Sequence, residues 1–197
     1  GALPLLVTWP VGLMFPLALP LGLGQVFERL EGAVAELLAD TPFLEWLPMR
    51  AVELQPLMPA TQSLCVALGL MLPVLLAYSV IPQRTTRLQA LGLLLLVAWA
   101  ATSLSGALTF GPMQIWAWLT QPALVGLALG MLVSLAAAWL GMRASLVLLL
   151  VAALMHASLV NLAPTDVYFD QTLQTWEQGR FIRFNGVAQW LGWLWPD

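Results

Sequence analysis

Five long apolar stretches without a charged side chain constrain this chain more than any other feature. They cover residues 3–24, 60–81, 88–110, 123–141 and 145–162. Each is close to the roughly 20 apolar residues that cross a bilayer core as a helix. Because only 9% of the residues are charged and 60% are hydrophobic, the chain has too few charges to cover a water-soluble surface. The sequence predicts an all-α transmembrane bundle of about five spans, forming a single domain over residues 1–197.

The first of these stretches differs from the other four because prolines interrupt it. Pro4, Pro10, Pro16 and Pro20 all fall within residues 3–24. A proline inside a helix lacks the amide proton that would bond to the carbonyl four residues earlier. We therefore expect this first span to be broken or tilted.

Two further segments have the composition of chain that lies at a membrane surface. Residues 25–58 begin with apolar positions at helical spacing, opposite Glu28, Arg29, Glu31 and Glu36. Residues 164–197 mix four acids and two arginines with four tryptophans. Indole rings favour the boundary between lipid and water. We predict an interfacial amphipathic segment over residues 25–58 and a Trp-rich interfacial tail over 164–197.

The distribution of arginine predicts an orientation in the membrane. The short segments 82–87 and 142–144 hold Arg84, Arg87 and Arg143 with no acid. Short basic loops of membrane proteins stay on the cytoplasmic side. We expect a bacterial inner-membrane protein with these two loops in the cytoplasm and with residues 25–58 and 164–197 in the periplasm.

Small residues recur every four positions in three of the spans, which favours close helix packing. The three series are Gly126, Gly130, Ser134 and Ala138; Cys65, Gly69, Pro73 and Ala77; and Ala98, Thr102 and Gly106. Packing within one bundle is the favoured interpretation, and dimerisation is the alternative.

Two single residues are the candidate catalytic groups. Cys65 is the one cysteine and His156 the one histidine, and the predicted topology puts both near the outer membrane face. A Cys/His pair there resembles the catalytic groups of exosortase transpeptidases, so a membrane-embedded enzyme is one alternative function. His156 alone could instead ligate a tetrapyrrole metal, which would make the chain a pigment- or cofactor-binding subunit of a membrane complex. Packing and hydrogen bonding are the plainer roles for both side chains.

The predicted outer face also gathers aromatic residues that could contact a ligand or partner. Trp116 and Trp118 lie between two spans, and Trp190 and Trp193 lie in the tail. Their plainer role is an aromatic belt at the interface. Arg180 and Asn185, in the same tail, are further binding candidates, with interface anchoring and capping as their plainer roles.

Composition excludes several classes of function. The net charge of −3 and the lack of a basic run argue against nucleic-acid binding. One Cys and one His cannot form a multi-ligand Cys/His metal site, and a chain without lysine has no Schiff-base chemistry. We expect no metal and no cofactor. The expected partners are the bilayer and an envelope lipid or membrane protein.

Two parts of the sequence, residues 62–81 and 161–196, resemble VanZ-like membrane proteins of proteobacteria. The motif that carries the resemblance comprises Gln178, Gly179, Arg180, Phe181, Phe184, Asn185 and Gly186. The resemblance implies a polytopic inner-membrane protein connected with the cell envelope and with glycopeptide resistance, and it supplies no catalytic residue. We expect a non-enzymatic protein that binds an envelope component or docks into a larger membrane assembly, because polar, aromatic and irregular segments accumulate on the predicted outer side while the other side has only short basic loops. The resemblance implies that this region corresponds to the portion after an N-terminal VanZ-like domain.

Overall fold

The computed structural model describes residues 2–14, 20–23, 34–39, 41, 58–110, 113, 115–116 and 118–162. This part of the chain is helical and contains no strand. Its main helices are α1 (Ala2–Leu13), α3 (Pro59–Val80), α4 (Arg84–Phe110), α5 (Gln121–Ala137) and α6 (Met142–Leu162). Residues 34–38 form a short helix within the predicted amphipathic segment. The all-α prediction is therefore confirmed for the described residues.

Three of the described helices are long and apolar enough to cross a membrane: Pro59–Val80, Arg84–Ala107 and Met142–Asn161. Two others, α1 with 12 residues and α5 with 17, are apolar but shorter. Each of the five predicted stretches thus contains a helix, but the number of five spans stays a prediction.

The helix ends correct two predicted loops. α4 begins at Arg84 and α6 begins at Met142, so Arg84, Arg87 and Arg143 all lie in the first turns of helices. The physical reason is that a helix extends past its apolar stretch wherever the backbone can continue to bond, and basic side chains do not stop it. Pro82 lies in the short connection between α3 and α4, where no helical amide proton is required.

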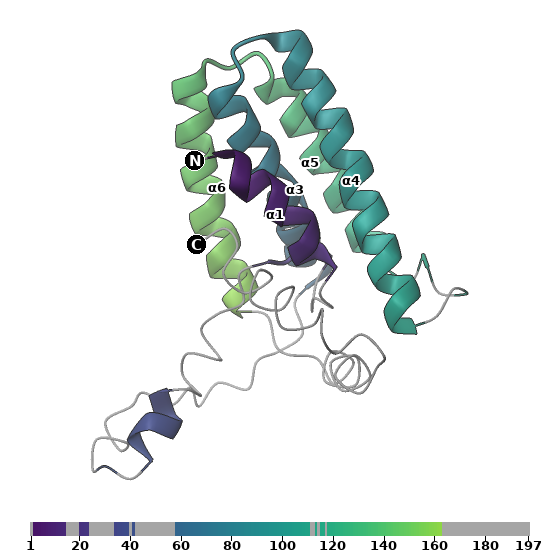
Figure 1. Ribbon diagram of the computed structural model, residues 1–197, viewed down its shortest axis with the longest axis vertical. Helices are drawn as coiled ribbons and strands as arrows, with labels where there is room; N and C mark the ends of the chain where they lie inside the picture. Colours follow the sequence, from purple (N-terminus) through teal and green to yellow (C-terminus); the bar gives the residue numbers. More distant parts are fainter. Residues whose placement is uncertain are drawn as a thin grey trace.

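Helix α3 is the centre of the bundle (Figure 1). Of its 22 residues, 14 are buried on all sides of the helix, which is typical of a helix surrounded by others. α5 and α6 make the most extensive contacts with α3, while α1 packs on both α3 and α4. Leucines on the outward faces of the surrounding helices are exposed, including Leu96 at 62%, Leu132 at 59% and Leu154 at 72%. Such faces suit contact with lipid chains.

The small-residue series explain the closest of these contacts. A Cβ atom added to Gly126 would overlap the Ser63 carbonyl and Val66, and one added to Gly130 would lie 2.9 Å from the Ala67 carbonyl oxygen. The two glycines therefore let the parallel helices α3 and α5 touch backbone to backbone. Ser134 and Ala138 continue this buried face. The small-residue series of α5 therefore packs against α3 within one bundle, as the favoured interpretation predicted.

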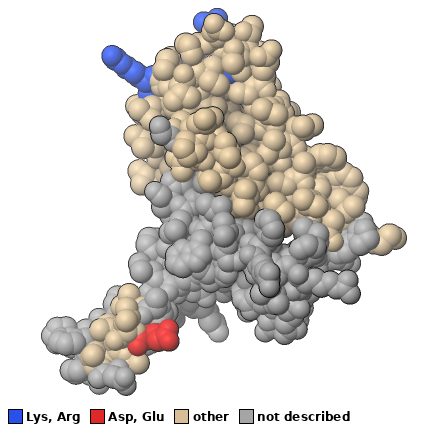
Figure 2. All heavy atoms as spheres, viewed as in Figure 1, with Lys and Arg blue, Asp and Glu red and all other residues tan. Residues whose placement is uncertain are grey.

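The two ends of the bundle differ in composition. Arg84, Arg87 and Arg143 gather where α3 and α5 end and α4 and α6 begin, which we name the Arg end (Figure 2). Trp116 and Trp118 lie between α4 and α5 at the opposite end, which we name the Trp end. The four helices α3–α6 alternate in direction, so both ends are built from segments far apart in the sequence.

Candidate functional site

The predicted first span is not described as one continuous helix, and its residues 20–23 are irregular backbone inside the bundle. α1 ends at Leu13, and the described residues 20–23 are not helical. Leu21, Gly22 and Leu23 are nevertheless buried. Irregular backbone at membrane depth is tolerated only where protein surrounds it and satisfies its polar groups. The expected break within residues 3–24 is therefore present, and its crossing of the membrane stays a prediction.

Polar side chains from two helices supply hydrogen bonds to this broken span. The Ser105 hydroxyl on α4 donates to the Met14 carbonyl at 2.9 Å. Nε2 of His156 on α6 lies 3.2 Å from the Leu23 carbonyl oxygen, which fits a neutral ring that carries its proton on Nε2. These side chains therefore act as supports for the irregular backbone.

Leu21 adopts a backbone conformation that L-residues rarely adopt. Its φ angle is 61°, in the left-handed region that costs a non-glycine residue about 1–2 kcal/mol. Its carbonyl oxygen lies so close to Gly69 of α3 that a Cβ there would overlap it. Only glycine at position 69 leaves room for this strained residue.

The two candidate catalytic groups lie close together but deeply buried. The backbone of Cys65 lies next to the His156 ring, so the structure does bring this pair of residues into one region. Cys65 is 0% exposed and His156 is 1% exposed. Because the surrounding helices cover both side chains, a substrate could reach neither without separation of the helices.

The same burial bears on the pigment interpretation. A metal bound at Nε2 of His156 would have to displace the Leu23 carbonyl that faces this nitrogen at 3.2 Å. The described residues contain no group of three or more His, Cys, Asp or Glu side chains arranged to hold a metal ion. A tetrapyrrole would therefore need a rearranged first span.

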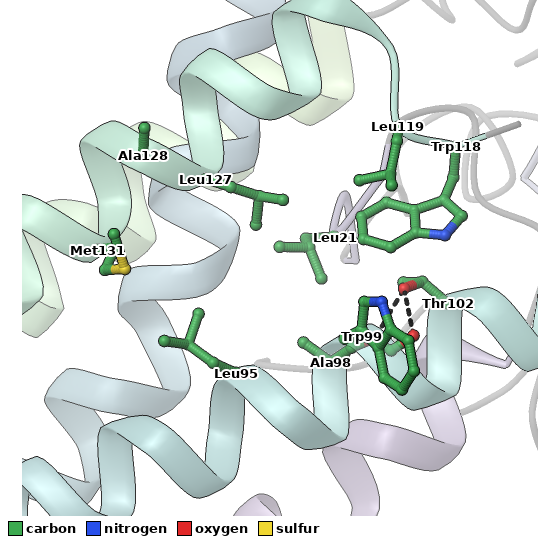
Figure 3. A pocket seen from close by; sticks show the side chains of 10 residues that line it. All are labelled: Leu21, Leu95, Ala98, Trp99, Thr102, Trp118, Leu119, Leu127, Ala128 and Met131. Carbon is green, nitrogen blue, oxygen red and sulfur yellow. Dashed lines mark hydrogen bonds between the residues drawn. The ribbon is translucent and has the colours of Figure 1, made fainter. Parts of the chain in front are cut away.

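An open apolar groove lies between α4 and α5 (Figure 3). It has a volume of about 340 Å³, within the range of about 300–1,000 Å³ that is usual for small-ligand pockets. Its walls comprise Leu95, Ala98, Trp99 and Thr102 of α4, Leu127, Ala128 and Met131 of α5, Trp118 and Leu119 before α5, and the strained Leu21. The sequence predicted Trp118 as a binding residue but did not predict this groove.

The predicted binding residues Trp116 and Trp118 both fold back onto α4. The rings of Trp116 and Trp99 have centroids 5.7 Å apart, and Nε1 of Trp118 donates to the Ser103 hydroxyl at 3.3 Å. Trp116 is 53% exposed and Trp99 is 48% exposed. A partly exposed aromatic surface therefore borders the groove at the Trp end.

Trp99 and Thr102 are groove residues that sequence reasoning missed. A signal was present, because Trp99 lies in the middle of a predicted span, 11 residues from each end of 88–110. Interfacial tryptophans lie near span ends instead.

Four predicted binding residues lie outside the described residues: Trp190, Trp193, Arg180 and Asn185. Their contribution to a site stays a prediction.

Arg87 is the most densely bonded side chain at the Arg end. It is 2% exposed, and its guanidinium donates to the carbonyls of Tyr78 at 2.7 Å and Ile81 at 2.7 Å. It also donates to the carbonyls of Ala138 at 3.2 Å and Leu140. These four oxygens belong to the C-terminal ends of α3 and α5. The cation therefore lies at the negative ends of two helix dipoles and joins them.

No protein-family model, curated protein or solved structure matches the chain.

Proposed function

We propose that this chain is a non-enzymatic membrane protein of the VanZ-like type that binds an envelope lipid at its Trp end. The observation that carries the proposal is the apolar groove between α4 and α5, bordered by Trp99, Trp116 and Trp118. Apolar pockets with a few aromatic side chains are the usual sites of ligand binding. The burial of Cys65 and His156 favours binding over the Cys/His enzyme as the function.

The proposed orientation follows from the arginines. Between residues 58 and 162 the chain has three arginines, all at the Arg end, and no acid. The rule that short basic segments stay in the cytoplasm favours the Arg end as cytoplasmic and the Trp end as periplasmic in a bacterial inner membrane. The groove would then meet lipids of the outer leaflet, where envelope components are accessible. This location fits the connection with glycopeptide resistance that the VanZ-like resemblance implies.

Lipid retention by tryptophan variants tests the proposed function. The whole chain is purified from its native membrane in mild detergent, and bound lipids are counted by native mass spectrometry. The double variant W116A/W118A should lose most of the retained lipid because the border of the groove is removed. Trp139, 58% exposed beyond the end of α5, supplies the matched control W139A, which should retain lipid. Equal retention in all three proteins would rule the proposed function out.

A further inference from the structure

The length of the groove along α5 matches the thickness of one leaflet of the bilayer core. Gln121 begins α5, and Met131 lies ten residues further along it, a rise of about 15 Å at 1.5 Å per residue. The bilayer core is about 30 Å thick. The groove therefore extends from the membrane surface at the Trp end to about the middle of the bilayer.

Two of the polar side chains that line the groove are already bonded within the protein. The Thr102 hydroxyl donates to the Ala98 carbonyl at 2.6 Å, and Nε1 of Trp118 donates to Ser103. The remaining walls are predominantly aliphatic. Neither Thr102 nor Trp118 is thus free to donate a hydrogen bond to a ligand inside the groove. Burying a polar group against such walls costs free energy wherever it finds no partner, so the walls favour a hydrocarbon occupant.

The floor of the groove is the strained residue Leu21. Strained conformations persist where the surrounding structure holds them, and they cluster at ligand sites. Here the hydrogen bond from His156 to Leu23 and the space left by Gly69 hold Leu21 in place. The same groups that support the broken span therefore shape the groove.

We infer that the α4–α5 groove holds one acyl chain of a bilayer phospholipid, with its headgroup at Trp116 and Trp118 and its terminal methyl near Met131. The inference rests on the proposed function and names the ligand class for its site. The groove opens between two helices whose outward faces suit lipid contact, and the bilayer supplies acyl chains there in large excess. Two partly exposed indole rings at its border match the headgroup level, which indole rings favour.

Photo-crosslinking with labelled lipid tests this assignment. The full chain is placed in nanodiscs that contain phosphatidylglycerol with a diazirine either near the ester end or near the methyl end of one acyl chain. After irradiation, crosslinked peptides are identified by mass spectrometry. The ester-end label should react mainly around Trp118 and Thr102, and the methyl-end label mainly around Leu95 and Met131. The reverse order, or even labelling over the outward faces of α5 and α6, would overturn the inference.

A variant that fills the groove supplies the second measurement. A128W places a large ring in the groove from the exposed side of α5, so folding is expected to be preserved. Groove crosslinks should fall several-fold in A128W and stay unchanged in A136W, a matched variant at an exposed alanine of α5 that does not line the groove. Unchanged crosslinks in A128W would also overturn the inference.

The two experiments fail separately. If W116A/W118A loses lipid while A128W retains its groove crosslinks, the chain binds lipid at its Trp end but the groove is not where the acyl chain lies. A polyprenyl lipid that displaces the labelled phospholipid from the groove at a small molar fraction would replace the acyl chain as the occupant and overturn the inference.

Discussion

At the residue scale, the glycines show how much the surroundings of a single position decide. Gly126 and Gly92 are both helical, yet a Cβ at Gly126 would overlap α3, whereas nothing lies within 4 Å of a Cβ at Gly92. The first glycine is required for packing, and the second is not. Adding a side chain at Gly126 should therefore lower the stability of the bundle, whereas adding one at Gly92 should not.

We predict that G126L destabilises the bundle and that G92L does not. Leucine at position 126 forces α3 and α5 apart, and overpacking of this kind costs about 1–3 kcal/mol. Leucine at position 92 points into open space and also improves helix propensity. Unfolding in mixed micelles with increasing denaturing detergent measures both variants. Similar unfolding midpoints for the two variants would contradict the close contact between α3 and α5.

At the element scale, side chains supply hydrogen-bonding partners for backbone groups at the helix ends. Arg87 bonds the ends of α3 and α5, and Thr120 caps the start of α5 by accepting from the amide of Ala123 at 3.4 Å. Carbonyls at a helix end have no partner within the helix. In a membrane protein such groups need partners from the protein, which explains why Arg87 is buried despite its charge.

Replacement of Arg87 should weaken the whole bundle. R87A leaves four carbonyls without their donor and should cost about 3 kcal/mol or more, because a hydrogen bond to a charged group contributes about 1.5–3 kcal/mol. R87K should recover only part of this loss, since a lysine ammonium cannot reproduce the planar fork of donors. The exposed Arg84 supplies the control R84A. Thermal unfolding in nanodiscs measures the series, and equal stability of R87A and R84A would contradict the role of Arg87.

The broken first span should depend on His156 in the same way. H156A removes the partner of the Leu23 carbonyl and opens a cavity, with an expected loss of about 2–4 kcal/mol. H156Q retains a donor and should lose less. Ser158 bonds only within its own helix, to the Leu154 carbonyl at 2.8 Å, so S158A should behave as the wild type. Limited proteolysis between α1 and α3 reports on the release of this segment; identical cleavage of H156A and wild type would count against the support by His156.

At the scale of the whole molecule, the gathering of Arg84, Arg87 and Arg143 at one end of the bundle predicts the orientation. Cys65 is the one cysteine and is buried, so a single new cysteine can be labelled with little background. In intact cells, a membrane-impermeant maleimide should label M113C at the Trp end and leave T85C at the Arg end unlabelled until the cells are opened. Labelling of T85C in intact cells would reverse the proposed orientation.

The parts of this fold that could be predicted from the sequence are those that depend on local pattern. Uncharged apolar stretches located α3–α6 to within a few residues, and the four-residue spacing of Gly126 and Gly130 identified the face that α5 buries. The role of Arg87 could not be predicted, because two of its acceptors lie 51 and 53 residues away in the sequence. The groove was missed for a similar reason: Leu21, Trp99 and Met131 share no local pattern and meet only after the helices pack.

The distance in sequence between Arg87 and its acceptors also sets an order of events during synthesis. Tyr78 and Ile81 precede Arg87 and are available as soon as it is made, but Ala138 and Leu140 follow it by 51 and 53 residues. At roughly 5–20 residues per second, the ribosome needs about 3–10 s to supply them. During that interval the guanidinium of Arg87, on α4, can bond only the end of α3. Its remaining N–H groups must then bond to water. Once α5 has been synthesised, the carbonyls of Ala138 and Leu140 replace this water. Arg87 therefore joins a helix that is made early to one that is made several seconds later.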